Sequence, residues 1–155
     1  MTGVITRGGV LAALPSDHLD ELMVLAREVS FPVGTRIIDE GSRADRFWVI
    51  RSGSVALDIH VPGRRPAMVE EIGAGELLGW SWLLPPRHWH LGAETQSLVW
   101  VYEFDGGAVR ALCRKEPELG MALAIEVADA IAQRLMASRT RLLDLYGPNG
   151  SGPAW

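Results

Sequence analysis

The apolar positions along the chain change their spacing twice. From about Pro15 to Glu28 they recur at helical spacing behind Ser16, a residue type that favours the N-cap of a helix. The apolar positions of this segment are Leu19, Leu22, Met23, Leu25 and Ala26. Between Val29 and Glu103, short runs of Val, Ile, Leu and Trp are broken by glycines, which is typical of short strands joined by turns. After Asp105 the helical spacing returns. The pattern predicts a helix, a compact antiparallel β region and a helical C-terminal part.

Residues 47–72, FWVIRSGSVALDIHVPGRRPAMVEEI, show the β region most clearly. Two strands are predicted to meet at Ser52-Gly53, and a second pair is predicted to be joined through residues 62–65. Gly34, Gly41 and Gly53 are expected in tight turns with positive φ, a conformation that costs glycine little.

The C-terminal part predicts a short helix over residues 106–115 and a longer one over residues 117–146. The longer helix carries an apolar stripe formed by Met121, Ile125, Ala128, Ala132, Leu135 and Leu142. A second apolar edge is formed by Val127, Ile131 and Leu135. One stripe would be satisfied by packing within the chain, whereas two edges favour a homodimer with helix 117–146 as its seam.

Composition narrows the class of protein. Hydrophobic residues make up 48% of the 155 residues and charged residues 22%, which is ordinary for one globular domain. We expect a domain over residues 11–146 and a flexible tail over residues 147–155.

The N-terminus resembles no signal peptide and no segment is long and apolar enough to span a membrane, so a cytoplasmic protein is expected. Cys113 is alone, which excludes an internal disulfide, and the net charge of −4 without a basic block argues against direct DNA binding.

Residues 31–57, FPVGTRIIDEGSRADRFWVIRSGSVAL, resemble the first half of the cyclic nucleotide-binding domain family, and the similarity extends over residues 11–146. The resemblance implies an α+β fold: an antiparallel β-roll, also called a jelly roll or double-stranded β-helix, with an N-terminal helix and two C-terminal helices. It also implies a non-enzymatic sensor or regulatory domain of the catabolite-activator and Fnr type. Its ligand would be a cyclic nucleotide, and no other cofactor is expected.

In that family the next segment is the phosphate-binding cassette, and residues 75–95, GELLGWSWLLPPRHWHLGAET, fall on it. Gly75, Glu76, Leu78 and Gly79 agree with the family pattern, and Arg87 takes the position of the arginine that neutralises the cyclic phosphate. In the family a short helix opens at the glycine and directs its free N–H groups to the phosphate. The candidate ligand-binding residues are Gly75, Glu76, Leu78, Gly79, Trp80, Ser81, Trp82, Arg87 and Trp89.

Three tryptophans depart from this pattern. Trp80 replaces the glutamate that accepts a hydrogen bond from the ribose, Trp82 replaces a small residue, and Trp89 replaces the alanine that follows the arginine by two positions. These indoles either stack on a flat ligand or fill the pocket themselves. In the second case the domain would act through contact with a protein partner.

His88, His90 and Glu94 suggest an alternative from another class. On a strand, residues two apart face the same side, so the two imidazoles and the carboxylate could bind a divalent metal as in a cupin. The glycine that cupins place before the first histidine is Trp82 here, and no further histidine follows Glu94.

Enzyme chemistry finds little support in the remaining motifs. The chain has no nucleophile elbow and no P-loop, and Cys113 lies in a segment predicted to be an amphipathic helix. In regulators of the catabolite-activator type, the long helix leads into a helix-turn-helix domain that binds DNA. This chain ends about nine residues after that helix, so a stand-alone sensor domain is expected.

Overall fold

The computed structural model describes residues 9–146 and confirms the α+β class. The chain begins with η2 (Leu11–Ala13), α1 (Ser16–Met23), β1 (Arg27–Phe31), β2 (Arg36–Ile38) and β3 (Arg46–Ser52). It continues with β4 (Val55–Ile59), β5 (Ala67–Ile72), β6 (Leu77–Leu78), β7 (Gly92–Thr95) and β8 (Val99–Asp105). Two helices follow, α2 (Gly106–Lys115) and α3 (Pro117–Tyr146), as the sequence predicts.

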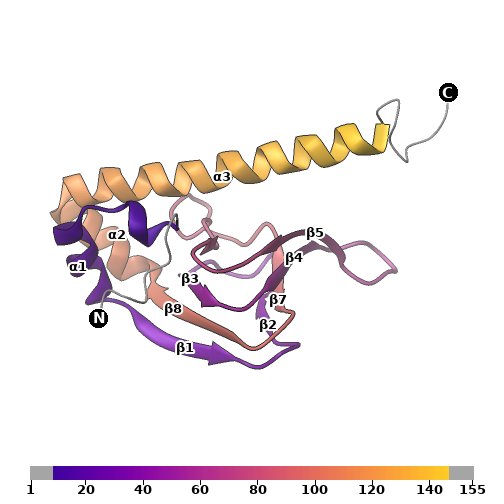
Figure 1. Cartoon of the computed structure of the whole chain (residues 1–155), viewed down its shortest axis with the longest axis horizontal. Helices are drawn as coiled ribbons and strands as arrows, with labels where there is room; N and C mark the ends of the chain where they lie inside the picture. Colours follow the sequence, from indigo (N-terminus) through magenta and orange to yellow (C-terminus); the bar gives the residue numbers. More distant parts are fainter. Residues whose placement is uncertain (1–8, 147–155) are drawn as a thin grey trace.

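The strands form two four-stranded antiparallel sheets that face each other as a β-roll. One sheet has the order β1-β8-β3-β6 and the other the order β2-β7-β4-β5. Figure 1 shows α1 and α2 gathered at one end of the roll, while α3 runs along one side of it. The fold that the resemblance implies is therefore confirmed.

The turn at Ser52-Gly53 joins two strands that belong to different sheets. The predicted strands on either side exist as β3 and β4, but they do not pair with each other. Gly53 has a φ of 98°, and a Cβ here would collide with the backbone oxygen of Leu98 and lie 2.9 Å from the Cα of Val99. Glycine thus allows the chain to cross from one sheet to the other. The second predicted pair is a true hairpin, in which Ile59 of β4 faces Ala67 of β5.

Helix α1 is shorter than the apolar spacing predicts. It ends at Met23, and Arg27 and Glu28 belong to β1, where Arg27 faces Glu103 of β8. Pairing with β8 satisfies backbone groups that a longer helix would have used. The predicted N-cap is also wrong: Pro15 occupies that position without a side-chain cap, and Ser16 is the first helical residue.

Two apolar clusters form the core. The first joins the helices to one end of the roll, and in it the Phe47 ring lies between Trp82 and Phe104, with centroid distances of 4.2 and 4.8 Å. The second fills the space between the two sheets and contains Trp48 stacked on Trp89 at 5.9 Å. Two of the cassette tryptophans are thus core residues.

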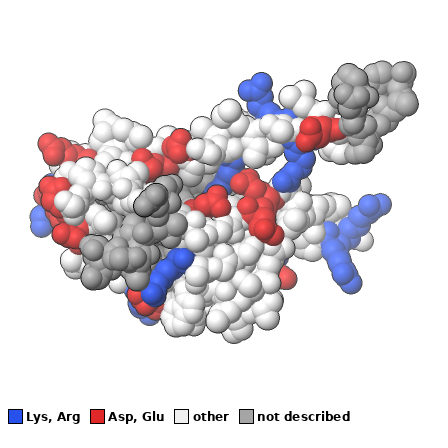
Figure 2. All heavy atoms as spheres, viewed as in Figure 1, with Lys and Arg blue, Asp and Glu red and all other residues white. Residues whose placement is uncertain are grey.

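Helix α3 has two opposed apolar faces. Leu119, Leu123 and Val127 are buried against the rest of the chain. The residues of the stripe are all exposed: Met121, Ile125, Ala128, Ala132, Leu135 and Leu142. Figure 2 shows mostly uncharged atoms along α3 on the face in view. The residues of the second predicted edge differ in exposure: Val127 is buried, whereas Leu135 is exposed. Packing within the described chain therefore leaves the stripe uncovered.

None of the helices in residues 9–146 has the length and apolar character that a membrane span requires. The tail predicted over residues 147–155 lies outside the described residues.

Candidate functional site

The cassette segment contains turns where the resemblance implies a short helix. After β6 the chain turns at Gly79, whose φ is 92°, and no helix is formed before β7 begins at Gly92. The backbone N–H of Leu83 donates to the carbonyl of Trp80 at 3.1 Å, as in a single turn. The expected helix N-terminus is therefore absent from this segment, and with it the row of free N–H groups that would face a phosphate.

Gly75 and Glu76 hold the turn that precedes β6. The N–H of Gly75 donates to the carbonyl of Ile50 at 2.7 Å, and the N–H of Ile50 donates to the carbonyl of Glu76 at 3.0 Å. The Glu76 carboxylate accepts a hydrogen bond from the N–H of Gly73 at 2.7 Å. The Glu76 side chain thus stabilises the turn in which Glu76 itself lies.

Trp82 is fully buried in the first cluster. Its exposed fraction is 0%, its indole stacks on Phe47, and its carbonyl accepts a hydrogen bond from Nη1 of Arg110 at 2.5 Å. Its ring N–H is buried without a hydrogen-bond partner. The ring therefore has no surface left to stack on a ligand.

Trp89 covers the cassette glycine from inside the roll. The Trp89 side chain is 8% exposed, and its ring carbons Cη2 and Cζ3 lie 2.6 and 2.7 Å from the position that a Cβ on Gly79 would take. Only glycine permits this approach of ring and backbone. The alanine-to-tryptophan change thus places an indole directly against the turn that would hold a phosphate.

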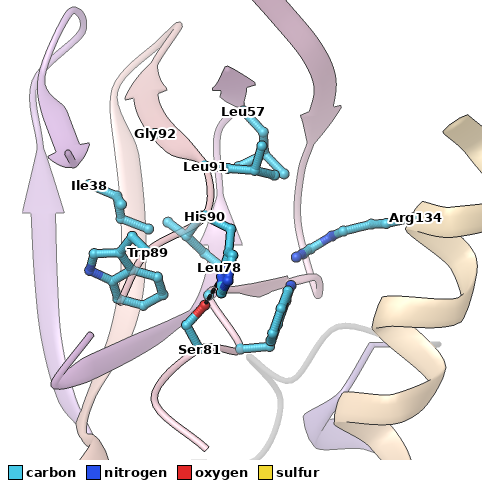
Figure 3. Close-up of a pocket in the computed structure, with 11 residues that line it drawn as sticks. Ile38, Leu57, Leu78, Ser81, Trp89, His90, Leu91, Gly92 and Arg134 are labelled. Atoms are coloured by element: carbon cyan, nitrogen blue, oxygen red, sulfur yellow. Dashed lines mark hydrogen bonds between the residues drawn. The ribbon is translucent and has the colours of Figure 1, made fainter. Parts of the chain in front are cut away.

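Trp80, Ser81 and His90 form a small polar and aromatic group at the opening of the remaining cavity. Trp80 is half-buried and stacks on the His90 ring at 5.3 Å with an interplanar angle of 13°. The Ser81 hydroxyl lies 3.2 Å from Nδ1 of His90, the contact drawn as a dashed line in Figure 3. The exposed His90 ring is thus held on two sides.

The cavity between these residues and the two sheets has a volume of about 30 Å³. Specific small-molecule sites have volumes of about 300–1,000 Å³. Its lining residues are Ile38, Leu57, Leu78, Gly79, Trp80, Ser81, Trp89, His90, Leu91, Gly92 and Arg134. The lining includes five of the predicted ligand-binding residues and omits Gly75, Glu76, Trp82 and Arg87.

Arg134 of α3 is a lining residue that the sequence did not single out. Figure 3 shows its side chain reaching from α3 toward the cavity, and its guanidinium donates to the carbonyl of Leu77. Burial lowers the pKa of Arg134, while Glu70 and Glu76 raise it. Its position on the roll-facing side of an otherwise apolar helix face is the sequence signal that could have found it.

A larger hollow of about 260 Å³ lies between α3 and the roll, with Arg134 lining both hollows. Its acidic lining residues are Glu70, Glu76, Glu126 and Asp129, and Figure 2 shows acidic side chains gathered below α3. Burial raises the pKa of Glu126, and the nearby charge of Asp129 raises it further.

Arg87 lies away from the cavity. Its backbone has a φ of 58°, which is unusual for a residue with a Cβ, and its carbonyl accepts a hydrogen bond from the N–H of Ala44 at 2.8 Å. Its side-chain Nε is buried and has no hydrogen-bond partner.

The three residues of the metal alternative do not converge. His88 forms an isolated bridge with Arg43, His90 lies outside any strand, and Glu94 is 3.4 Å from Arg36. The premise that both histidines share a strand is therefore wrong. Among the described residues no group of three or more His, Cys, Asp or Glu side chains could hold a metal ion.

Three features of this arrangement differ from a nucleotide pocket. The cavity of about 30 Å³ is smaller than a small-molecule site, Trp89 covers Gly79, and Trp80 supplies no acceptor for a ribose hydroxyl.

Comparison with known proteins finds a similar curated regulator. The curated CRP-like cAMP-activated global transcriptional regulator of Mycobacterium tuberculosis (strain ATCC 25618 / H37Rv) is 25% identical over 145 residues, which are 94% of this chain and 63% of the relative. The chain thus spans less than two thirds of the length of the curated relatives it matches.

Solved structures share the fold. The N-terminal domain of a transcriptional regulator from Streptomyces coelicolor A3(2) is 27% identical, with a TM-score of 0.67 over 91% of this chain and 95% of that chain. A cyclic nucleotide-binding domain from Methylobacillus flagellatus KT is 18% identical, with a TM-score of 0.77 over 84% of this chain and 73% of that chain. The family model described as "Cyclic nucleotide-binding domain" matches residues 28–116. The chain belongs to the cyclic nucleotide-binding domain family.

Proposed function

We propose that this chain is a non-enzymatic regulatory domain whose nucleotide pocket is filled by its own tryptophans, and that it acts through protein contact. The observation that carries the proposal is the position of Trp89, whose ring covers Gly79 and leaves a cavity of about 30 Å³. The similarity to a curated relative that is a CRP-like cAMP-activated global transcriptional regulator supports a regulatory role. A cytoplasmic location stays a prediction.

The proposal that the chain is not an enzyme is supported by the environments of its candidate nucleophiles, Cys113 and Ser81. The thiol of Cys113 has a pKa raised by burial, which makes it a poor nucleophile at neutral pH. Ser81 and His90 are 3.2 Å apart, but His90 stacks on Trp80, and within residues 9–146 no hydrogen bond joins its ring to a carboxylate that would orient it as a base.

A second copy of the chain is the proposed partner of α3. The exposed stripe faces away from the roll, so a symmetric partner can cover it without displacing the buried face of the helix. The proposed regulatory unit is a homodimer.

The test restores the family residues in the pocket. Trp80→Glu returns an acceptor for a ribose hydroxyl, and Trp89→Ala uncovers Gly79. We expect no binding of cyclic AMP or cyclic GMP to the natural chain by calorimetry, and measurable binding to the double variant. Trp100→Ala is the matched control, because this tryptophan is 40% exposed on β8 and does not line the cavity.

Binding of either nucleotide to the natural chain would contradict the filled pocket. Circular dichroism and the melting temperature establish that each variant is folded before its binding is measured. A folded double variant that binds neither nucleotide would show that the obstruction extends beyond these two indoles.

A further inference from the structure

The exposed stripe of α3 follows a regular repeat that one residue interrupts. From Met121 to Leu142 its positions lie alternately four and three residues apart, which is the spacing of the a and d positions of a coiled coil. Between Leu135 and Leu142 the position that continues this repeat is Arg139. The stripe thus carries a charged residue at an a position, where the repeat predicts an apolar one.

Arg139 takes no part in the packing of α3 on the rest of the chain. Its side chain is exposed, and within residues 9–146 no salt bridge joins it to a carboxylate. The face of α3 that packs on the chain is the opposite one, where Leu123 and Val127 are buried. The position of Arg139 therefore matters for contacts that α3 makes with another molecule.

The apolar surface around Arg139 is wider than the seam between two helices. Met136, Leu143 and Leu145 flank the stripe at the e and g positions of the same repeat, and all three are exposed. In a two-stranded coiled coil the e and g positions border solvent and are often charged. A broad apolar face buries its flanking positions only when more than one helix packs on it. The apolar pattern of this half of α3 therefore favours assemblies of three or more helices.

A charged residue at an a position discriminates between these assemblies. In a parallel pair of helices the seam is narrow, so a long side chain can extend its guanidinium group into water while its methylene groups cover apolar surface. In an assembly of three or more helices the a positions face a closed axis, where several guanidinium groups would be buried together. The free-energy cost of that burial opposes every assembly larger than a pair.

We propose that Arg139 limits the self-association of α3 to two chains. This inference rests on the proposed homodimer and deepens it. The stripe fits a second copy of the chain, because a repeat of alternating four and three residues interdigitates with the same repeat. Ala128 and Ala132 are small residues at successive positions of the stripe, so two helices can approach closely there. Arg139 excludes further helices at the wider apolar end.

Sedimentation equilibrium of the full chain tests this limit. We expect the natural chain to have the mass of two chains and Arg139→Leu to have a mass at least about 1.5-fold higher, because three or more helices can then share the apolar face. Arg141→Leu is the matched control, since it removes the same charge and adds the same side chain at an exposed position off the stripe. The control and Arg139→Lys, which keeps the charge, should both retain the mass of two chains.

The outcomes separate this inference from the homodimer itself. A natural chain with the mass of one chain would contradict the homodimer, and this inference with it. A natural pair that remains a pair in Arg139→Leu would overturn this inference alone. An equal rise in mass in Arg139→Leu and Arg141→Leu would also overturn it, because the added apolar surface and not its position would then be responsible. Since Arg139 is exposed, we expect circular dichroism to show that its variants fold like the natural chain.

Discussion

At the scale of the residue, the three cassette tryptophans have three different environments. Trp82 is part of the helical core, Trp89 fills the roll, and Trp80 stacks on a histidine at the opening of the cavity. The sequence singled out all three as departures from the family pattern. It left open whether the indoles fill the pocket, because that depends on contacts with Phe47 and Gly79, which are distant in sequence or specific to the turn.

Truncation of a buried indole should cost far more than truncation of an exposed one. We expect Trp82→Ala to lower the free energy of unfolding by about 3–5 kcal/mol, because it leaves a hole beside Phe47. Trp100→Ala serves as the control and should lose less than half as much, since its side chain is partly exposed. Urea denaturation measures both, and equal losses would contradict the burial of Trp82.

His18 makes stability depend on pH near neutrality. Its Nδ1 lies 3.3 Å from Glu21 and its Nε2 lies 3.6 Å from Glu118 of α3. The hydrogen bond to Glu21 raises the pKa of His18 above its ordinary value of 6.5, burial opposes this, and Asp17, Glu21 and Glu118 raise it by their charges. The folded state therefore holds the proton more tightly than the unfolded chain.

The stabilisation by His18 should be fully present below pH 6.5 and be lost as the pH rises through the higher pKa of the folded state. We expect the free energy of unfolding to fall as the pH rises above 6.5 through the raised pKa of His18, and to fall less in His18→Gln. Urea denaturation across this range gives the two slopes. Identical slopes would show that His18 does not hold its proton in the fold.

At the scale of the element, the sequence predicted helices α2 and α3 and the β4–β5 hairpin correctly. Their signals are local: helical spacing, a proline at the start of α3, and a Pro-Gly turn between β4 and β5. The missed features depend on pairing over long distances. The end of α1 is set by β8, and the assignment of β3 and β4 to different sheets is set by the closing of the roll.

The exposed stripe of α3 makes a prediction at this scale. Ile125 and Leu135 are 56% and 61% exposed in the single chain. If a second copy covers them, Ile125→Glu or Leu135→Glu places a charge in an apolar seam, and static light scattering should give the mass of a monomer. Arg141→Glu also places a charge on α3 but off the stripe, and should leave the dimer intact. An unchanged mass in all three variants would exclude this seam.

At the scale of the whole molecule, the first apolar cluster and the two hollows meet at α3. The first cluster includes Leu123 and Val127 of α3, and Arg134 lies between the cavity in the roll and the acidic hollow. The sequence predicted the helix, and the spacing of Arg134 marks it as an exception on an apolar face, but its place between the two hollows depends on the angle at which α3 crosses the roll.

The crossing of α3 has a mechanical consequence. The helix contains 30 residues and is therefore about 45 Å long, yet its buried residues end at Val127. Beyond Arg134 every described residue of the helix is exposed. The helix is thus a lever anchored as far as Arg134: the 12 residues beyond it extend about 18 Å, so a tilt of about 5° at Arg134 moves the far end by about 1.6 Å. Changes in packing around Arg134 are therefore carried along this exposed part of the helix to Tyr146.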